Sequence, residues 1–384
     1  MLHWLDSMME TCKRWLKTGV ILLLLCVLST GLSGAWWDFG GSSEPKRESV
    51  LPQGNAITDG KALLRYALPI DNEPVRKIQR SLEDIATRIR GKRWSPINGD
   101  IAIASRVLST QKSELLASIP EDKQVEAEAI IAELNTGIET LRGALEIKDG
   151  ETLLETRAEL LKQVGELEEL MVEGFPFEVP AEYANLPQLK GRATVKITTN
   201  RGDLTVVADG YSAPLTAGNF VDLVERGFYD GLKFVRANES YYVGVGDPPG
   251  EDVGFIDPKT GVERNIPLEI LVQSETEPLY EFTLEEIGRY RDQPVLPFSA
   301  YGTVALARPE PLPNGGSSQI FFFLFEPELT PAGLNLLDGR FAAFGYVVEG
   351  KEVLRDLQQG DQIESAKVIQ GADNLVEPQV ASTM

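Results

Sequence analysis

The spacing of apolar residues changes in the middle of the chain, and this change limits what the chain can fold into. Before it, apolar residues recur in steps of three and four, as at Val75, Ile78 and Leu82, which places them on one face of a helix. After it, residues 193–198 and 204–208 alternate between apolar and polar with period two, as strands do. At 384 residues the chain is long enough for two domains. The sequence therefore predicts an α+β protein whose helical part precedes its β-rich part.

The helical pattern covers residues 57–173. Asn72 fits an N-terminal cap for the helix that carries the first apolar stripe. Residues 118–121 have the pattern of a capping box that opens a later helix, and residues 148–151 interrupt the pattern again. Two more apolar stripes indicate the later helices: Ile131, Leu134, Ile138, Leu141 and Leu145, then Leu160, Val164, Leu167 and Met171. We expect an antiparallel bundle of about four helices with these stripes as its core.

A linker separates the two patterns. Residues 174–190 contain prolines that favour an extended chain over a helix. The two alternating runs beyond the linker are joined by Asn200-Arg201-Gly202-Asp203, a sequence typical of a hairpin turn. We therefore expect a β-rich domain over residues 191–372 and a short tail over residues 373–384.

The N-terminus has the pattern of an export signal. Three basic residues precede an apolar run at 20–28, and Ser33-Gly34-Ala35 supplies small residues for cleavage. The run is short for a membrane span, which needs about 20 apolar residues. Two alternatives stay open, an uncleaved N-terminal anchor and a lipoprotein attached through Cys26. We expect a signal peptide over residues 1–35 and a flexible linker over residues 36–56.

Charge and residue usage exclude several classes of function. The chain has 58 acidic and 37 basic residues, a formal net charge of −21, which argues against nucleic acid and anionic membranes as primary partners. Its one histidine and two cysteines, His3, Cys12 and Cys26, lie in the segment that cleavage would remove. The mature chain would then lack Cys-His and Ser-His catalysis, thiolate or imidazole metal sites and disulfides. We expect no cofactor and no metal.

Four sequence blocks follow one another through the β-rich part. They are Pro214 to Val221 with residues 227–231, Phe234-Val235-Arg236 with Val243 to Pro248, Gly302 to Arg308 with Ser318-Gln319-Ile320-Phe321, and Leu337 to Gly345. With these blocks, residues from about 191 to 369 resemble a cyclophilin, a peptidyl-prolyl cis-trans isomerase domain. The resemblance implies a closed eight-stranded β-barrel capped by two helices. It also implies that the domain binds proline-containing protein segments.

The resemblance further implies roles for individual residues. Arg236 takes the place of the family's catalytic arginine. A cation directed at the prolyl nitrogen localises the lone pair whose delocalisation makes the X-Pro bond resist rotation. Gln319 takes the place of a glutamine that positions the substrate carbonyl. The walls of the proline pocket would be formed by Phe234, Tyr241, Leu306, Phe321, Leu336, Leu337 and Phe341.

Several positions depart from the family pattern, namely Val235, Gly244, Arg308, Leu336 and Phe341. Gly244 stands where a glutamine is expected, so no side-chain amide from this position steadies Arg236. Two hypotheses therefore stay open. The chain is an isomerase with low or regulated activity, or it is a proline-binding chaperone or scaffold with little turnover. In the second hypothesis the helical domain could mask the pocket.

Residues 248–300 form a longer segment than ordinary family members have between the corresponding blocks. Its acidic stretch, residues 275–291, is expected to be partly helical. With Arg289, Arg291 and nearby prolines, the segment could fold over the active face as a lid or dock another protein. A plain surface elaboration is the alternative.

The order of the parts is itself informative. A helical module joined to a divergent cyclophilin behind an export signal is similar to the multidomain cyclophilins of the thylakoid lumen in cyanobacteria and chloroplasts. That resemblance implies a PsbQ-like helical domain and a role in the assembly and maintenance of photosystem II, whose lumenal loops are candidate partners. The short bacterial-type signal favours a cyanobacterial origin, with the thylakoid lumen or the periplasm as location. We expect a monomer that is not inserted in the membrane after cleavage.

Overall fold

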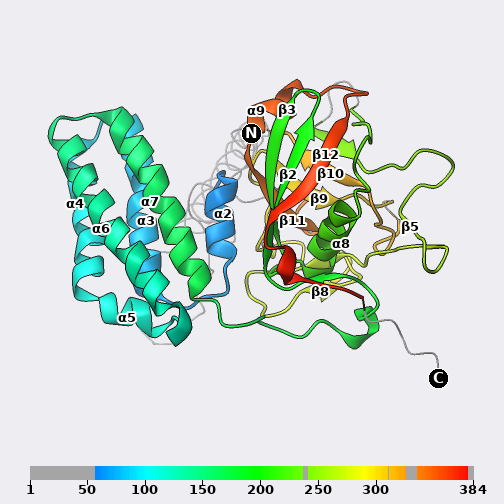
Figure 1. The fold of residues 1–384 in the computed structure, drawn as a ribbon, viewed down its shortest axis with the longest axis horizontal. Helices are drawn as coiled ribbons and strands as arrows, with labels where there is room; N and C mark the ends of the chain where they lie inside the picture. Colours follow the sequence, from blue (N-terminus) through cyan, green and yellow to red (C-terminus); the bar gives the residue numbers. More distant parts are fainter. Residues whose placement is uncertain (1–56, 237–240, 310, 326–334, 379–384) are drawn as a thin grey trace, which may run out of the picture. The chain divides into compact units, whose positions relative to one another are not determined.

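The computed structural model describes residues 57–236, 241–309, 311–325 and 335–378 (Figure 1). The predicted signal peptide, the linker over residues 36–56 and the end of the predicted tail lie outside these ranges. Within the described ranges, no helix is long and apolar enough to cross a membrane.

Four long helices form the helical part, as predicted. Helix α3 packs against α4 and α7, and α6 packs against the same two helices. The predicted stripes form one buried core, in which Val75, Ile78 and Leu82 are fully buried. The bounds are α3 (Glu73–Arg90), α4 (Trp94–Thr110), α6 (Gln124–Glu146) and α7 (Gly150–Leu170), with the short α5 (Lys112–Ala117) between α4 and α6.

One of the two predicted helix starts is confirmed and the other is wrong. The Asn72 side-chain oxygen accepts a hydrogen bond from the Val75 amide at 3.0 Å, which caps α3. The predicted capping box at Ser118 does not form, since α6 begins only at Gln124. The Ser118 hydroxyl instead accepts a hydrogen bond from the Asn72 side-chain amide at 3.0 Å. Ser118 therefore bonds to the residue that caps α3 and does not cap α6.

The β-rich part is built on one antiparallel sheet of seven strands. The predicted hairpin is confirmed by the pairing of Thr199 with Gly202. The strand order is β12-β2-β3-β11-β9-β10-β4. The bounds are β2 (Arg192–Thr199), β3 (Gly202–Asp209), β4 (Tyr242–Val245), β9 (Thr303–Leu306), β10 (Ile320–Phe323), β11 (Ala343–Glu349) and β12 (Ile363–Gln370). Two-stranded pairs flank it: β1 (Gln188–Leu189) with β13 (Leu375–Val376), β5 (Ile256–Asp257) with β6 (Val262–Glu263), and β7 (Glu269–Ile270) with β8 (Leu279–Tyr280).

The expectation of a closed eight-stranded barrel is wrong, because the described sheet is open. Its edge strands, β12 and β4, do not pair with each other. Residues 233–235 lie where an eighth strand would close the sheet. They make only isolated bridges there, Lys233 with Gln362 and Val235 with Gly244. Single bridges do not extend into a ladder, so this segment does not form the eighth strand.

The two faces of the sheet bury different sets of side chains. Along β10, Ile320 and Phe322 belong to one core, whereas Phe321 and Phe323 belong to another, as strand alternation requires. The first core is covered by helix α8 (Pro214–Glu225) and bordered by helix α9 (Lys351–Asp356) (Figure 1). Helix α2 (Gly60–Ala67), which no pattern singled out, contributes Leu63, Leu64 and Ala67 to the second core.

The long segment of residues 248–300 is part of these cores. Its side chains Leu296, Phe298 and Ala300 are buried in the second core beside Phe321. The stretch expected to be partly helical forms turns and the short strand β8, and it contains no helix. One such turn is closed by Thr283 and Glu286, and Gly288, with φ of +74°, ends it. A left-handed residue at that point stops a helix from continuing.

Glu269 ties this segment to the start of helix α8. Its carboxylate is 1% exposed and accepts hydrogen bonds from the backbone amides of Leu215 and Thr216 and from the Thr216 hydroxyl, at 3.0 to 3.3 Å. These amides are otherwise unpaired at a helix N-terminus. Burial raises the pKa of Glu269 to about 7, although the amide hydrogen bonds oppose the shift.

We expect the protein to become more stable as the pH falls from about 8 to about 5. The folded-state pKa of Glu269 lies above its ordinary value of 4.5, so in this window the folded chain binds more protons than the unfolded chain. Burial raises the pKa of Glu168 in α7 to about 7 as well, with the same sign. For Glu269 alone the gain is on the order of 3 kcal/mol. Urea denaturation across this pH range measures it.

The matched variants for this prediction are Glu269→Gln and Glu277→Gln. Glu269→Gln keeps an acceptor for the helix amides but does not titrate, so the pH dependence of unfolding should become flatter. Glu277 is exposed in the same segment, and its replacement should leave the dependence unchanged. An equal slope in wild type and Glu269→Gln contradicts the prediction.

Candidate proline-binding site

A cavity of about 400 Å³ opens beside strands β4 and β10. Its apolar wall is aromatic, since the rings of Phe341 and Tyr242 meet the ring of Phe321 edge-on at centroid distances of 5.4 and 5.7 Å. The lining residues are Val235, Tyr242, Gly244, Val245, Asp247, Ala307, Arg308, Gln319, Ile320, Phe321, Leu337 and Phe341. The cavity therefore combines apolar rings with an amide and two charged groups.

The pairing of β10 with β4 explains why the cavity is open at Phe321. Phe321 is paired with Gly244 across the two strands. Because Gly244 has no side chain, nothing from β4 covers the Phe321 ring at that position. A Cβ atom added at Gly244 would lie 3.6 Å from its nearest neighbour, which is ordinary van der Waals contact. The missing glutamine noted in the sequence thus corresponds to open space in the cavity wall.

Four of the predicted site residues lie together at this cavity, namely Gln319, Phe321, Leu337 and Phe341. Four other predicted pocket residues do not line it. Phe234 and Leu306 are buried in the first core, at 0% and 5% exposed. Tyr241 and Leu336 are 63% and 85% exposed. On β4 the neighbouring Tyr242 lines the cavity instead, because successive side chains of a strand point to opposite faces.

Arg236, the predicted catalytic arginine, also does not line this cavity. Its guanidinium donates hydrogen bonds to the backbone carbonyls of Leu354, Arg355 and Leu357, at the C-terminal end of α9. Its backbone amide donates to the Gln359 side chain at 2.7 Å. Val235, the preceding residue, lines the cavity. Cations bind well to the carbonyls that a helix leaves unpaired at its C-terminus.

The side-chain amide of Gln319 is held by hydrogen bonds to residues at the start of the long segment. Its Nε2 donates to the Asp247 carboxylate at 3.2 Å and to the Val253 carbonyl at 2.7 Å. Asp247 also lines the cavity. Gln319 therefore has a fixed orientation, in which its NH₂ group points toward residues 247–253.

Arg308 is a charged residue of the cavity that the sequence analysis noted only as a departure from the family pattern. It follows β9, and its guanidinium donates to the Arg340 carbonyl from Nε at 3.1 Å and from Nη2 at 2.6 Å. The guanidinium carbon lies 5.2 Å from the centroid of the Phe341 ring. Its position directly after the Thr303–Leu306 strand and Ala307 was the sequence signal that could have identified it.

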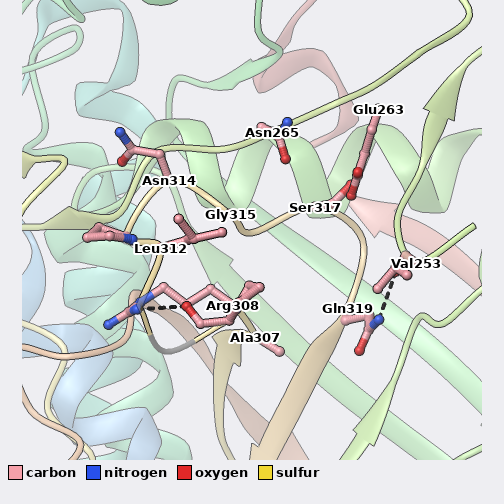
Figure 2. Close-up of a pocket in the computed structure, with 12 residues that line it drawn as sticks. Val253, Glu263, Asn265, Ala307, Arg308, Leu312, Asn314, Gly315, Ser317 and Gln319 are labelled. Atoms are coloured by element: carbon pink, nitrogen blue, oxygen red, sulfur yellow. Dashed lines mark hydrogen bonds between the residues drawn. The ribbon is translucent and has the colours of Figure 1, made fainter.

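A second cavity of about 720 Å³ shares Ala307, Arg308 and Gln319 with the first. Figure 2 shows these residues, with the Gln319 amide bonded to Val253 and with Glu263 and Asn265 on the opposite side. Its remaining lining residues are Pro309, Leu312, Pro313, Asn314, Gly315 and Ser317.

A turn at residues 335–341 carries Leu337 and Phe341 into the cavity. Within it, Asp338 accepts hydrogen bonds from the Phe298 amide at 2.8 Å and from the Asn335 amide at 3.3 Å. Burial raises the pKa of Asp338 to about 6. The hydrogen bond between Asp338 and Phe298 thus holds this turn against the segment of residues 248–300.

Comparison with known proteins identifies both parts of the chain. Residues 59–172 match the family model of the PsbQ-like domain of CYP38-like peptidyl-prolyl cis-trans isomerases. Residues 194–377 match the model of cyclophilin-type peptidyl-prolyl cis-trans isomerases.

Relatives that match across both parts of the chain agree with these results. A Synechocystis protein named as a thylakoid lumen peptidyl-prolyl cis-trans isomerase is 55% identical over 363 residues, covering 94% of this chain and 96% of the relative. The chloroplastic isomerase CYP38 of Arabidopsis thaliana is 46% identical, covering 86% of this chain and 78% of the relative. The chloroplastic CYP37 of the same plant is 34% identical, covering 86% and 74%. The chain therefore belongs to the cyclophilin-type peptidyl-prolyl cis-trans isomerases that carry a PsbQ-like helical domain.

Proposed function

We propose that the cavity of about 400 Å³ is the site where this isomerase binds the proline of an X-Pro bond. The observation that carries the proposal is the grouping of Phe321, Leu337 and Phe341 at one recess next to Gln319. Rings and an aliphatic side chain suit a pyrrolidine ring, and binding sites commonly combine such walls with a few polar groups. The second cavity is then available to the residues that flank the proline.

We further propose that the substrates are exported or lumenal proteins, and that the protein assists the assembly and maintenance of photosystem II. The names of the Synechocystis and Arabidopsis relatives support a lumenal or chloroplast location. The match to a PsbQ-like domain supports a link to the oxygen-evolving complex. Proline-containing lumenal loops of photosystem II subunits are the candidate substrates under this proposal. Under it residues 1–35 are a signal peptide, and residues 57–173 and 191–372 are the helical and the cyclophilin-like parts of the chain.

A second candidate function is proline binding with little turnover, as in a chaperone or scaffold. The position of Arg236 on the carbonyls of α9 favours it, since that guanidinium is not directed into the cavity. No comparable observation favours the idea that the helical part masks the cavity. The residues that line the two cavities all lie between 235 and 341.

Substitution of Val235 by tryptophan should lower kcat/KM for a proline peptide by about tenfold or more, because the indole would occupy the recess. Val235 is 49% exposed, so the change does not disturb a core. The measurement is isomerisation of a short X-Pro peptide by the full chain. Val262→Trp is the matched control, since Val262 is 64% exposed and lines neither cavity. Unchanged turnover in Val235→Trp contradicts the assignment of the site, and wild type that binds but does not turn over the peptide supports the second candidate.

A further inference from the structure

The second cavity, of about 720 Å³, contains a carboxylate that no other side chain pairs with. Among the described residues that line it, Glu263 and Arg308 are the charged ones. Within the part of the chain that the structure describes, the Glu263 carboxylate forms no ion pair and no hydrogen bond. In the same ranges the side chain of Asn265, which also lines the cavity, has no hydrogen-bond partner. Two groups with oxygen acceptors are therefore available to a ligand.

The backbone keeps Glu263 and Asn265 on the cavity side. Arg264 and Ile266 are buried, whereas Glu263 and Asn265, which alternate with them, line the cavity. The Arg264 guanidinium donates to the buried Asp222 carboxylate on α8 at 2.6 Å. This inward ion pair fixes which way the segment faces. Glu263 is thereby directed to the cavity without a partner of its own.

The Glu263 carboxylate lies close to the backbone of Gly254. A Cβ atom added at Gly254 would lie 2.3 Å from the Glu263 Oε1 and 2.5 Å from the Ser317 Oγ. The absence of a side chain at Gly254 thus lets the carboxylate lie beside Ser317, which also lines the cavity. Glu263 is nevertheless partly exposed, so a ligand can reach it.

The rest of the cavity wall is partly apolar. Val253 and Leu312 are 65% and 57% exposed, and Pro309 and Pro313 line the cavity with them. Lysine and arginine side chains pack their aliphatic stems on apolar surface and keep the charged end in a polar place. Exposed apolar side chains beside an unpaired carboxylate therefore suit a basic side chain.

Arg308, the other charged residue, favours the same position for a bound cation. Its guanidinium donates to the carbonyls of Arg340 and Pro309, at 2.6 and 3.2 Å, and lies 5.2 Å from the centroid of the Phe341 ring. Figure 2 shows Arg308 and Glu263 at opposite ends of the cavity. Because like charges repel, a basic side chain is more stable at the Glu263 end.

We propose that the second cavity selects substrates with a lysine or arginine close to the proline, and that Glu263 determines this preference. The inference rests on the proposed proline site. The two cavities share Ala307, Arg308 and Gln319. A peptide with its proline in the first cavity therefore places a neighbouring residue at the second.

The test uses X-Pro peptides that carry one lysine or one glutamate, in place of alanine, at either of the two positions before or after the proline. We measure kcat/KM for isomerisation and Kd by fluorescence anisotropy with the full chain. At one position at least, lysine should give about tenfold higher kcat/KM and about tenfold lower Kd than glutamate. The preference should shrink at high salt. Glu263→Gln should remove most of it, and Glu263→Lys should reverse it.

The matched control is Glu364→Lys, which changes the net charge as Glu263→Lys does. Glu364 is exposed on β12 and lines neither cavity, so its variant should keep the wild-type preference. Equal losses in the two lysine variants would mean that overall charge sets the preference, which overturns the inference. Circular dichroism establishes that each variant is folded, and Glu263→Gln decides if Glu263→Lys is not.

The remaining outcomes separate the inference from the proposed function. Equal values for lysine and glutamate peptides at every position, or a preference for glutamate, overturn the inference while the proline site stands. An alanine peptide that neither binds nor isomerises contradicts the proline site, and the inference fails with it. Binding without turnover supports the second candidate function, and Kd then gives the charge preference.

Discussion

Replacement of Phe298 by alanine should lower the free energy of unfolding by about 3 to 5 kcal/mol, the usual cost of removing a large buried aromatic side chain. Phe298 is 2% exposed. Its ring stacks on Phe321 at a centroid distance of 6.0 Å and meets Phe323 edge-on at 5.6 Å. The substitution thus leaves a void directly behind the aromatic wall of the proposed proline site. Chemical denaturation of the full chain measures the loss.

The control for this prediction is Phe282→Ala in the same long segment. Phe282 is 52% exposed, so its removal should change the free energy of unfolding by no more than about 0.5 kcal/mol. Similar small effects for both variants contradict the view that the segment is part of the core. That result would instead favour the surface elaboration considered from the sequence.

The second large effect is expected at Gly246, which follows strand β4. Its φ is +112°, and a Cβ atom there would lie 2.2 Å from the Ser318 carbonyl oxygen. That oxygen belongs to the backbone and cannot rotate away. Gly246→Ala should therefore destabilise the chain by roughly 2 to 6 kcal/mol, from backbone strain and steric overlap together. Thermal and urea unfolding measure the change.

Gly244→Ala is the comparison variant, two residues earlier and within strand β4. Its added Cβ meets only ordinary contacts, at 3.6 and 3.9 Å, and its backbone is not left-handed. We expect its stability to lie within about 1 kcal/mol of wild type. If the two alanine variants have the same free energy of unfolding, the prediction is contradicted. The close approach of Gly246 to the Ser318 backbone would then not require a glycine at position 246.

The helical part shows what can be predicted from local sequence. The stripe of Val75, Ile78 and Leu82 is fully buried, and Asn72 caps the helix that carries it. Both features depend on residues within one or two turns of each other, so they can be read from spacing alone. The capping box at Ser118 failed because the serine hydroxyl binds Asn72, a partner distant in the chain.

At the proposed site, too, the sequence identified some of the residues and misplaced others. Sequence resemblance brought together Gln319, Phe321, Leu337 and Phe341, which share one cavity. It placed Tyr241 at the wall, where the structure has Tyr242. A shift of one residue along a strand reverses the side that a side chain faces, and strand spacing by itself does not show which of two adjacent tyrosines faces the cavity.

The sequence by itself determined the helical and β-rich parts, the family and most of the aromatic wall, because hydrophobic period and motif order are local properties. Only the tertiary structure decided that the sheet stays open and that the long segment backs the wall with Phe298. It also decided which arginine lies at the cavity. That choice depends on contacts between Arg236 and the end of α9, and between Arg308 and the Arg340 carbonyl, which join residues far apart in sequence. A long, flexible guanidinium takes its position from such partners, not from its neighbours in the chain.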